Sequence, residues 1–191
     1  MAVTAKLPVS VDGGRSFTKI SGQYRHFCAI EVDTTLWCWG QNLKGEVAPL
    51  AACQYCFAPI RAASSVLTSW LDVAVGSLHS CALAENGTVF CMGFNGYGNL
   101  GIGTITNSPG VPKRVAPKVK YNFTQIAAGS HHTCGLLADG QAMCWGWNNM
   151  GQMAGNLTVG AAYYYSLPRA WWPKHTFTKI ACGVTNTYAI E

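Results

Sequence analysis

Two residue types in this chain could react or bind metal and also recur at regular spacing: cysteine and histidine. Six of the nine cysteines form three pairs separated by ten positions: Cys28 and Cys38, Cys81 and Cys91, Cys134 and Cys144. Such pairs either join as disulfides or pack in the core as reduced thiols. A matched pair in each copy of a repeat favours disulfides, and with them an oxidising compartment.

The other three cysteines follow no such rule. Cys53 and Cys56 form a C-x-x-C motif, which is typical of redox sites and of half a zinc site. No second C-x-x-C and no histidine pair lies nearby in the sequence, so we interpret the motif as a loop staple. Because nine is odd, Cys182 is predicted either to pair with one of these two or with a segment outside the chain.

Three histidines, His26, His79 and His132, recur at intervals of 53 residues. Equivalent imidazoles of successive repeats could line a channel and bind a metal ion. The alternative is that each ring hydrogen-bonds the backbone of its own repeat. We favour the alternative because equivalent positions need not converge, and because the fourth copy has Asn186 instead. No metal and no cofactor is predicted.

Charge and motif content argue against catalysis and against nucleic acid. The eight acidic residues form no pair spaced for acid–base work, and no nucleophile elbow or phosphate loop is present. The net charge is only +5, and the one basic concentration, Lys113 to Lys120, lies on a Pro-rich linker. No apolar run approaches the roughly 18 residues of a membrane span. We therefore predict a non-enzymatic chain that binds no nucleic acid and does not insert into a membrane.

The elements that position these residues repeat with the same period. Short alternating strands are expected at residues 17–20, 70–73, 123–126 and 177–180. A hairpin should follow each, with strands 81–84 and 88–91 joined through Asn86-Gly87, and strands 134–137 and 141–144 through Asp139-Gly140. A three-residue loop places Cys81 opposite Cys91. The first copy has Thr34 at the glycine position, so Thr34 must adopt a positive φ or its turn must differ.

The landmarks Ile126-Ala127-Ala128-Gly129, His132, Asp139-Gly140, Cys144-Trp145-Gly146 and Gly151-Gln152 resemble the regulator of chromosome condensation repeat. The resemblance implies an all-β propeller. Residues 1–191 are then one propeller segment, with repeats at about 17–69, 70–122 and 123–176 and a partial repeat at 177–191. A second partial repeat is expected at the other end, where Leu7-Pro8-Val9 resembles the tail of a preceding blade. The ring is incomplete, so it is part of a larger propeller or is completed by a partner. The Cys-rich form is similar to extracellular crinkly-type propellers of plant receptor kinases.

Three N-glycosylation sequons agree with export. They begin at Asn86, Asn122 and Asn156, each on a predicted turn or linker that can accommodate a glycan. With the cysteine pairs they predict an extracellular or cell-surface glycoprotein that carries N-linked glycans. The N-terminus lacks the apolar stretch of a signal peptide, so a secreted form must already be processed or cut from a longer chain.

The long third loop holds an aromatic group without strand-like alternation, namely Tyr163, Tyr164, Tyr165, Trp171 and Trp172. These side chains either pack beside the core or form a contact surface, where Tyr and Trp are enriched. The first function we predict is a structural component that assembles with protein partners or with itself. The alternative is a receptor or inhibitor-type domain that recognises a protein or glycan through its loops.

Overall fold

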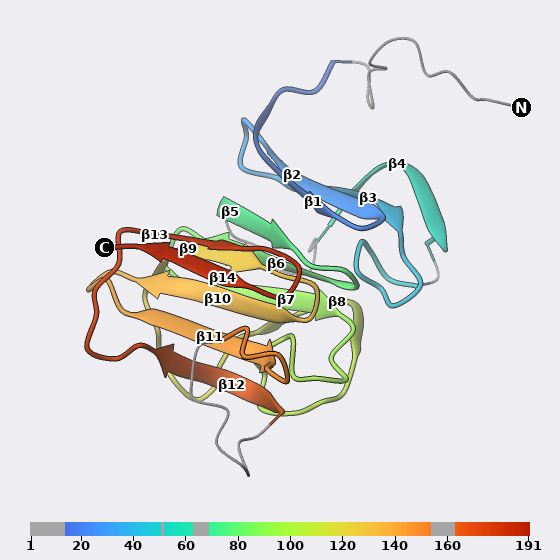
Figure 1. Ribbon diagram of the computed structural model, residues 1–191. Coiled ribbons are helices and arrows are strands. Elements are labelled where there is room, and N and C mark those ends of the chain that lie inside the picture. Colours follow the sequence, from blue (N-terminus) through green and yellow to red (C-terminus); the bar gives the residue numbers. More distant parts are fainter. Residues whose placement is uncertain (1–13, 51, 63–68, 154–162) are drawn as a thin grey trace, which may run out of the picture.

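The computed structural model describes residues 14–50, 52–62, 69–153 and 163–191, and the regular structure in these ranges is all β-strand (Figure 1). No helix that could cross a membrane is found among the described residues. The expected all-β class is therefore confirmed. The predicted sequon at Asn156 and the predicted tail of a preceding blade, Leu7-Pro8-Val9, lie outside the described ranges.

The strands form three four-stranded antiparallel sheets and one two-stranded sheet, each in chain order. The first sheet contains β1 (Phe17–Gln23), β2 (His26–Glu31), β3 (Leu36–Gln41) and β4 (Tyr55–Arg61). The second contains β5 (Trp70–Val75), β6 (His79–Ala84), β7 (Val89–Gly93) and β8 (Ser108–Arg114). The third contains β9 (Phe123–Ala128), β10 (His132–Leu137), β11 (Ala142–Trp147) and β12 (Tyr164–Trp171). The last contains β13 (Lys179–Cys182) and β14 (Thr187–Ile190).

The central hairpin of each sheet has the register that its turn residues predict. In the second sheet Cys81 pairs with Cys91 and Leu83 with Val89, and the turn glycine Gly87 has a φ of 75°. Thr34 takes the same role in the first sheet with a φ of 69°. An L-residue with a side chain rarely adopts this conformation. The turn of the first sheet therefore has the same backbone conformation as that of the second, although threonine replaces glycine.

Each proline-containing strand lies at the outer edge of its sheet. These strands are β4 with Pro59, β8 with Pro112 and β12 with Pro168. Proline has no amide proton to donate to a ladder, so an edge strand tolerates it best. The prolines therefore lie where the sheet has no further strand to pair with.

The sheets pack face to face as successive blades. β5 lies against β1 and β2, β9 lies against β5 and β6, and β13 lies against β9 and β10. Buried aliphatic and aromatic side chains fill each seam. The described strands form a row of blades that does not close into a ring, which is an incomplete propeller (Figure 1).

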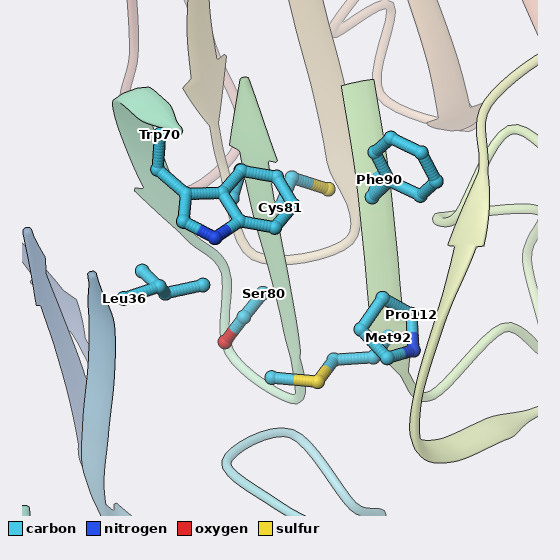
Figure 2. Close-up of a pocket in the computed structure, with 8 residues that line it drawn as sticks. Leu36, Trp70, Ser80, Cys81, Phe90, Met92 and Pro112 are labelled. Carbon is cyan, nitrogen blue, oxygen red and sulfur yellow. The ribbon is translucent and has the colours of Figure 1, made fainter. Parts of the chain in front are cut away.

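The seam between the first two blades shows how tightly these faces fit. Leu36 of β3 lies beside Trp70 of β5, and the Trp70 ring meets Phe90 edge-on at 5.9 Å (Figure 2). The cavity left between them measures about 10 Å³, with Ser80 among its lining residues. That volume holds no more than about one water molecule. The seam is a packed core and not a ligand site.

Candidate functional site

The cysteine pairs lie across the central hairpins. Cys28–Cys38, Cys81–Cys91 and Cys134–Cys144 are joined as disulfides, with Cα–Cα distances of 4.0, 4.1 and 4.1 Å. Cys53 and Cys56 are joined within the loop, with a Cα–Cα distance of 5.5 Å. Cys182 pairs with neither Cys53 nor Cys56 and is a free thiol within this chain, so pairing with a segment outside the chain stays a prediction.

The three histidines form a ladder of hydrogen bonds between blades, which we call the histidine ladder. In each case Nε2 meets the hydroxyl of a residue on the next blade. The pairs are His26 with Ser80 at 3.0 Å, His79 with Thr133 at 2.9 Å and His132 with Thr187 at 3.0 Å. The sequence prediction that each ring bonds its own repeat's backbone is therefore wrong. The rings reach across because β2, β6 and β10 each face the following blade.

The hydroxyl partners fix the protonation of the rings. The Ser80 hydroxyl donates to the carbonyl oxygen of Glu46 at 2.7 Å, and the Thr133 hydroxyl donates to that of Asn99 at 3.2 Å. A hydroxyl has a single proton, so it can only accept from the histidine. Nε2 of His26 and His79 therefore carries the proton, and Nδ1 is an unprotonated nitrogen without a hydrogen-bond partner.

Burial keeps these histidines neutral. It lowers the pKa of His26 to about 4, partly offset by a hydrogen bond to the backbone of His79. Burial, with smaller contributions from nearby histidines, lowers the pKa of His79 to about 3. Burial also lowers the pKa of His132 to about 4. Neutral rings in fixed hydrogen bonds serve structure and are poorly suited to proton transfer at neutral pH.

The glycine that ends the inner strand makes room for the ring. A Cβ atom on Gly76 would overlap the His79 ring, and a Cβ on Gly129 would overlap the His132 ring. Both glycines therefore serve a close approach between backbone and imidazole. The sequence shows that they repeat with the histidines, but only the structure shows the contact.

One group of side chains in the described ranges has ligand atoms close enough for a metal ion. It consists of His132, Cys134 and Cys182, whose candidate atoms all lie within 4.8 Å of one another. The sulfur of Cys134 is already bonded to that of Cys144 in a disulfide, and burial raises the pKa of Cys182 to about 12. Metal binding by cysteine requires a thiolate. The donor set is therefore poor, and we assign no metal to it.

Buried asparagines anchor the loops that follow the third strand of each blade, and sequence reasoning assigned them no role. Asn95 accepts the amide proton of Leu100 at 2.9 Å and donates to the carbonyls of Thr104 and Thr106. Asn42 and Asn148 likewise accept amide protons five residues further along the chain. Their repetition at 53 residues was the available signal. These contacts hold the loop face of the propeller in shape.

The predicted aromatic surface divides into buried and exposed members. Trp171 is 6% exposed and packs against Phe177, so it belongs to the core and is not available as a surface contact. Tyr165 is partly buried and lies under the Arg169 guanidinium. Tyr163, Tyr164 and Trp172 are exposed, with 72%, 41% and 49% of their areas accessible. These three stay candidates for contact.

A second aromatic group, which we call the loop-face cluster, was missed. It consists of Phe94, Tyr97, His131 and Trp147. Tyr97 stacks on Trp147 at 5.3 Å, and both rings meet His131, at 5.4 and 5.7 Å. Tyr97 is 38% exposed, and Trp147 pairs with Tyr164 across β11 and β12. The cluster therefore extends the exposed tyrosines into one aromatic surface that spans the second and third blades.

The two described sequons are exposed and close together. Asn86 and Asn122 both lie on the surface, and a Cβ on Gly87 would meet the Asn122 side chain. The turn of the second blade therefore lies beside the linker that enters the third. A glycan on either asparagine would project from the same edge of the molecule.

Comparison with known families identifies the repeat. One model of the regulator of chromosome condensation (RCC1) repeat matches residues 70–99 and 123–152, and another matches 86–136. The repeats of this chain are RCC1 repeats. The matched residues cover the hairpins with two of the disulfides and two of the ladder histidines, His79 and His132.

Human HERC6, a probable E3 ubiquitin-protein ligase, is 30% identical to this chain over 129 residues. The aligned region is 68% of this chain but 13% of HERC6. This chain therefore spans a small part of the relative. The similarity concerns the RCC1 repeats and leaves the ligase activity with the relative.

Solved structures share the fold. Human WBSCR16 superposes with a TM-score of 0.77 at 21% identity, covering 92% of this chain and 44% of that one. Yeast RCC1 (Prp20), solved bound to Kap60, gives 0.74 at 19% identity and covers 91% and 41%. The Physcomitrella patens receptor kinase CR4 ectodomain gives 0.53 at 18% identity and covers 94% and 43%. At these identities the likeness shows the fold alone.

Proposed function

We propose that this chain is a non-enzymatic propeller module that acts through protein–protein contact, as a structural component of an extracellular or cell-surface glycoprotein assembly. The observation that carries the proposal is the disulfide at one register in each of the three complete blades. Such bonds persist in secreted proteins and are rare in the cytosol. The exposed sequons at Asn86 and Asn122 support the same compartment.

Protein contact as the mode of action rests on the surface and on the fold. Aromatic side chains are exposed along the loop face, and such residues dominate protein interfaces. The yeast RCC1 propeller, which has this fold, is solved in complex with the protein Kap60. The neutral, hydrogen-bonded histidines of the ladder offer no acid or base, which supports a role other than catalysis.

Intact-mass analysis of the protein from its natural source tests the compartment. We expect a loss of mass on enzymatic removal of N-glycans and a gain of eight hydrogens on reduction of four disulfides. The Asn86→Gln and Asn122→Gln variants should each lose one glycan. A protein with nine free thiols and no glycan would contradict the extracellular role.

Recognition of a separate ligand is the second candidate, and the loop-face cluster is the observation that favours it. The stacked pair of Tyr97 and Trp147 offers aromatic faces of the kind that pack against apolar groups and sugar rings, and Nδ1 of His131 is a buried polar atom without a partner. A glycan array with the wild-type chain and with Tyr97→Ala tests this role. Binding that the variant retains, or no binding at all, would remove the candidate.

A further inference from the structure

A pocket between the second and third blades takes no part in the sites described above. We call it the linker pocket, because the β8–β9 linker forms one of its walls. It measures about 340 Å³, and its apolar lining comes from Ile102, Ala116, Pro117, Val119 and Leu167. Val119 and Leu167 are each 46% exposed, so the lining is open to solvent. Both blades have all four strands in this chain, so the opening is not the edge of an unfinished blade.

The linker wall is a β-turn of fixed shape. The amide of Val119 donates to the carbonyl of Ala116 at 2.9 Å, and Pro117 presets the backbone at the second position of the turn. The third blade ends in an equivalent turn, in which the amide of His175 donates to the carbonyl of Trp172 at 3.0 Å. Ala116 and Trp172 both have a positive φ, of 45° and 50°, and both precede a Pro-Lys pair. The turn therefore belongs to the repeat and is already formed in the free chain.

Backbone hydrogen bonds also fix the other walls of the linker pocket. The amide of Gly103 donates to the carbonyl of Ser166 at 2.7 Å, which ties the loop after β7 to β12. The amide of Ala116 donates to the carbonyl of Gly101 at 2.9 Å, which ties the turn to the same loop. The three walls therefore hold one another in place. A preformed pocket lowers the entropy that binding must overcome.

The rim of the linker pocket is basic. Lys118 lines it, and the Arg114 guanidinium donates to a carbonyl of the same turn at 3.4 Å. Lys113 and Lys120 lie exposed on the same linker. No acidic residue occurs in the sequence between positions 86 and 138, and no acidic residue lines the pocket. An unbalanced group of cations around an apolar lining favours a ligand that is both apolar and anionic.

We propose that the linker pocket binds an acidic peptide segment of a partner protein. One aliphatic side chain of that segment inserts between Ile102, Val119 and Leu167, and carboxylates on either side of it face Lys118 and Arg114. The pocket lies near the lower limit of about 300 Å³ for ligand sites, which suits a single inserted side chain. This inference rests on the protein contact proposed above as the mode of action and names the chemistry of the partner.

Two other anionic ligands match the linker pocket less well. A nucleic acid supplies charge but no aliphatic group for the apolar lining, and proteins that bind it usually carry a longer basic stripe. A fatty acid supplies the aliphatic group but has a single carboxylate to set against the four cations of the linker. An acidic peptide supplies both features at once.

Nuclear magnetic resonance titration of the full, isotope-labelled chain tests the proposal. The probe is the acetylated and amidated pentapeptide Glu-Glu-Leu-Glu-Glu. We expect saturable shifts of the amide signals of Gly103, Lys118 and Leu167. Replacing the central leucine of the peptide by alanine should weaken binding by about tenfold, because the apolar lining loses its partner. Replacing the four glutamates by glutamine should weaken it by about fivefold, because the ion pairs at the rim are lost.

Two variants of the chain locate the site. Lys118→Glu should weaken binding by about fivefold, because it reverses one rim charge. Leu167→Glu should weaken it by about tenfold, because it places a carboxylate in the apolar lining. Val111→Glu is the matched control, since Val111 is 45% exposed at the equivalent position of β8 and does not line the pocket. Amide spectra of each variant without peptide report whether it is folded, and Val111→Glu should bind like the wild type.

Several results would overturn the proposal. They are the absence of saturable shifts, equal binding of the leucine and alanine peptides, and a Leu167→Glu chain that is folded and binds like the wild type. Decanoate that saturates the pocket where the peptide does not would replace the peptide by a fatty acid. None of these results bears on the disulfides and glycans, so failure here is distinguishable from failure of the proposed compartment.

Discussion

Replacing Thr133 by valine should destabilise the protein by breaking one rung of the histidine ladder. Valine has nearly the shape of threonine but has no hydroxyl, and Thr133 is fully buried. The change removes the acceptor that lies 2.9 Å from His79 Nε2. It also removes the donor to the Asn99 carbonyl, but that oxygen still accepts from Trp145 Nε1 at 2.9 Å. A single group, the His79 N–H, is left without a partner.

The expected magnitude follows from that one orphaned donor. A buried donor left unpaired costs about 1–3 kcal/mol. We therefore expect the free energy of unfolding to fall by about 2 kcal/mol. His79→Phe combined with Thr133→Val removes both polar partners, and replacing both can be nearly neutral. The two substitutions together should then cost clearly less than the sum of their separate effects.

Urea unfolding followed by tryptophan fluorescence measures the change in free energy. The matched control is Thr124→Val, because Thr124 lies exposed on β9 and its hydroxyl bonds a carbonyl at 3.2 Å. Exposed substitutions of this kind change stability by about 0.5 kcal/mol or less. A Thr133→Val variant as stable as this control would refute the reasoning. Additive effects of His79→Phe and Thr133→Val would refute it as well.

Three further predictions concern the sulfur atoms and the ladder. The ladder histidines have folded pKa values below their ordinary value of about 6.5, so the stability they contribute is complete above pH 6.5 and is lost as pH falls toward 4. In that window each histidine should lower the free energy of unfolding by about 1.4 kcal/mol per pH unit. Urea midpoints that do not change between pH 7 and 5 would contradict this. Replacing Cys81 and Cys91 together by alanine should lower the free energy of unfolding by about 3 kcal/mol, because the unfolded chain is no longer constrained by the bond. Thermal unfolding measures the change, and an unchanged melting temperature would show that the bond is absent. Burial raises the pKa of Cys182 to about 12, so iodoacetamide should label it far more slowly at pH 8 than it labels free glutathione, and labelling at the glutathione rate would show an exposed thiol.

The sequence predicted the hairpins well because their signals are local. Asn86-Gly87 selects the turn, the turn fixes the register, and the register places Cys81 opposite Cys91. Of the two alternatives left open for Thr34, a positive φ or a different turn, the structure has the positive φ. Repetition at 53 residues extended each of these local inferences to the other blades.

Contacts between residues of different blades could not be predicted from these local signals. The partner of His79 is Thr133, 54 residues away, and only the packing of one blade on the next brings them together. The loop-face cluster was missed for the same reason, since Tyr97 and Trp147 belong to different blades. Trp171 and Trp172 are neighbours in sequence, yet only Trp171 faces the core, because the end of β12 sets their directions. Burial at strand ends depends on the neighbouring blade and not on local sequence.

Peptide mapping without reduction tests the central claim, that each complete blade is closed by a disulfide across its central hairpin. Trypsin cleaves after Lys and Arg, which places each predicted pair within one peptide: residues 26–44, 45–61, 62–113 and 121–169. After alkylation of free thiols we expect each of these peptides to be unmodified and two hydrogens lighter than its reduced form. When alkylation is carried out in denaturant, which exposes the buried thiol, the peptide 180–191 should carry alkylated Cys182. Alkylated cysteines in the first four peptides, or disulfides that join different peptides, would contradict the account.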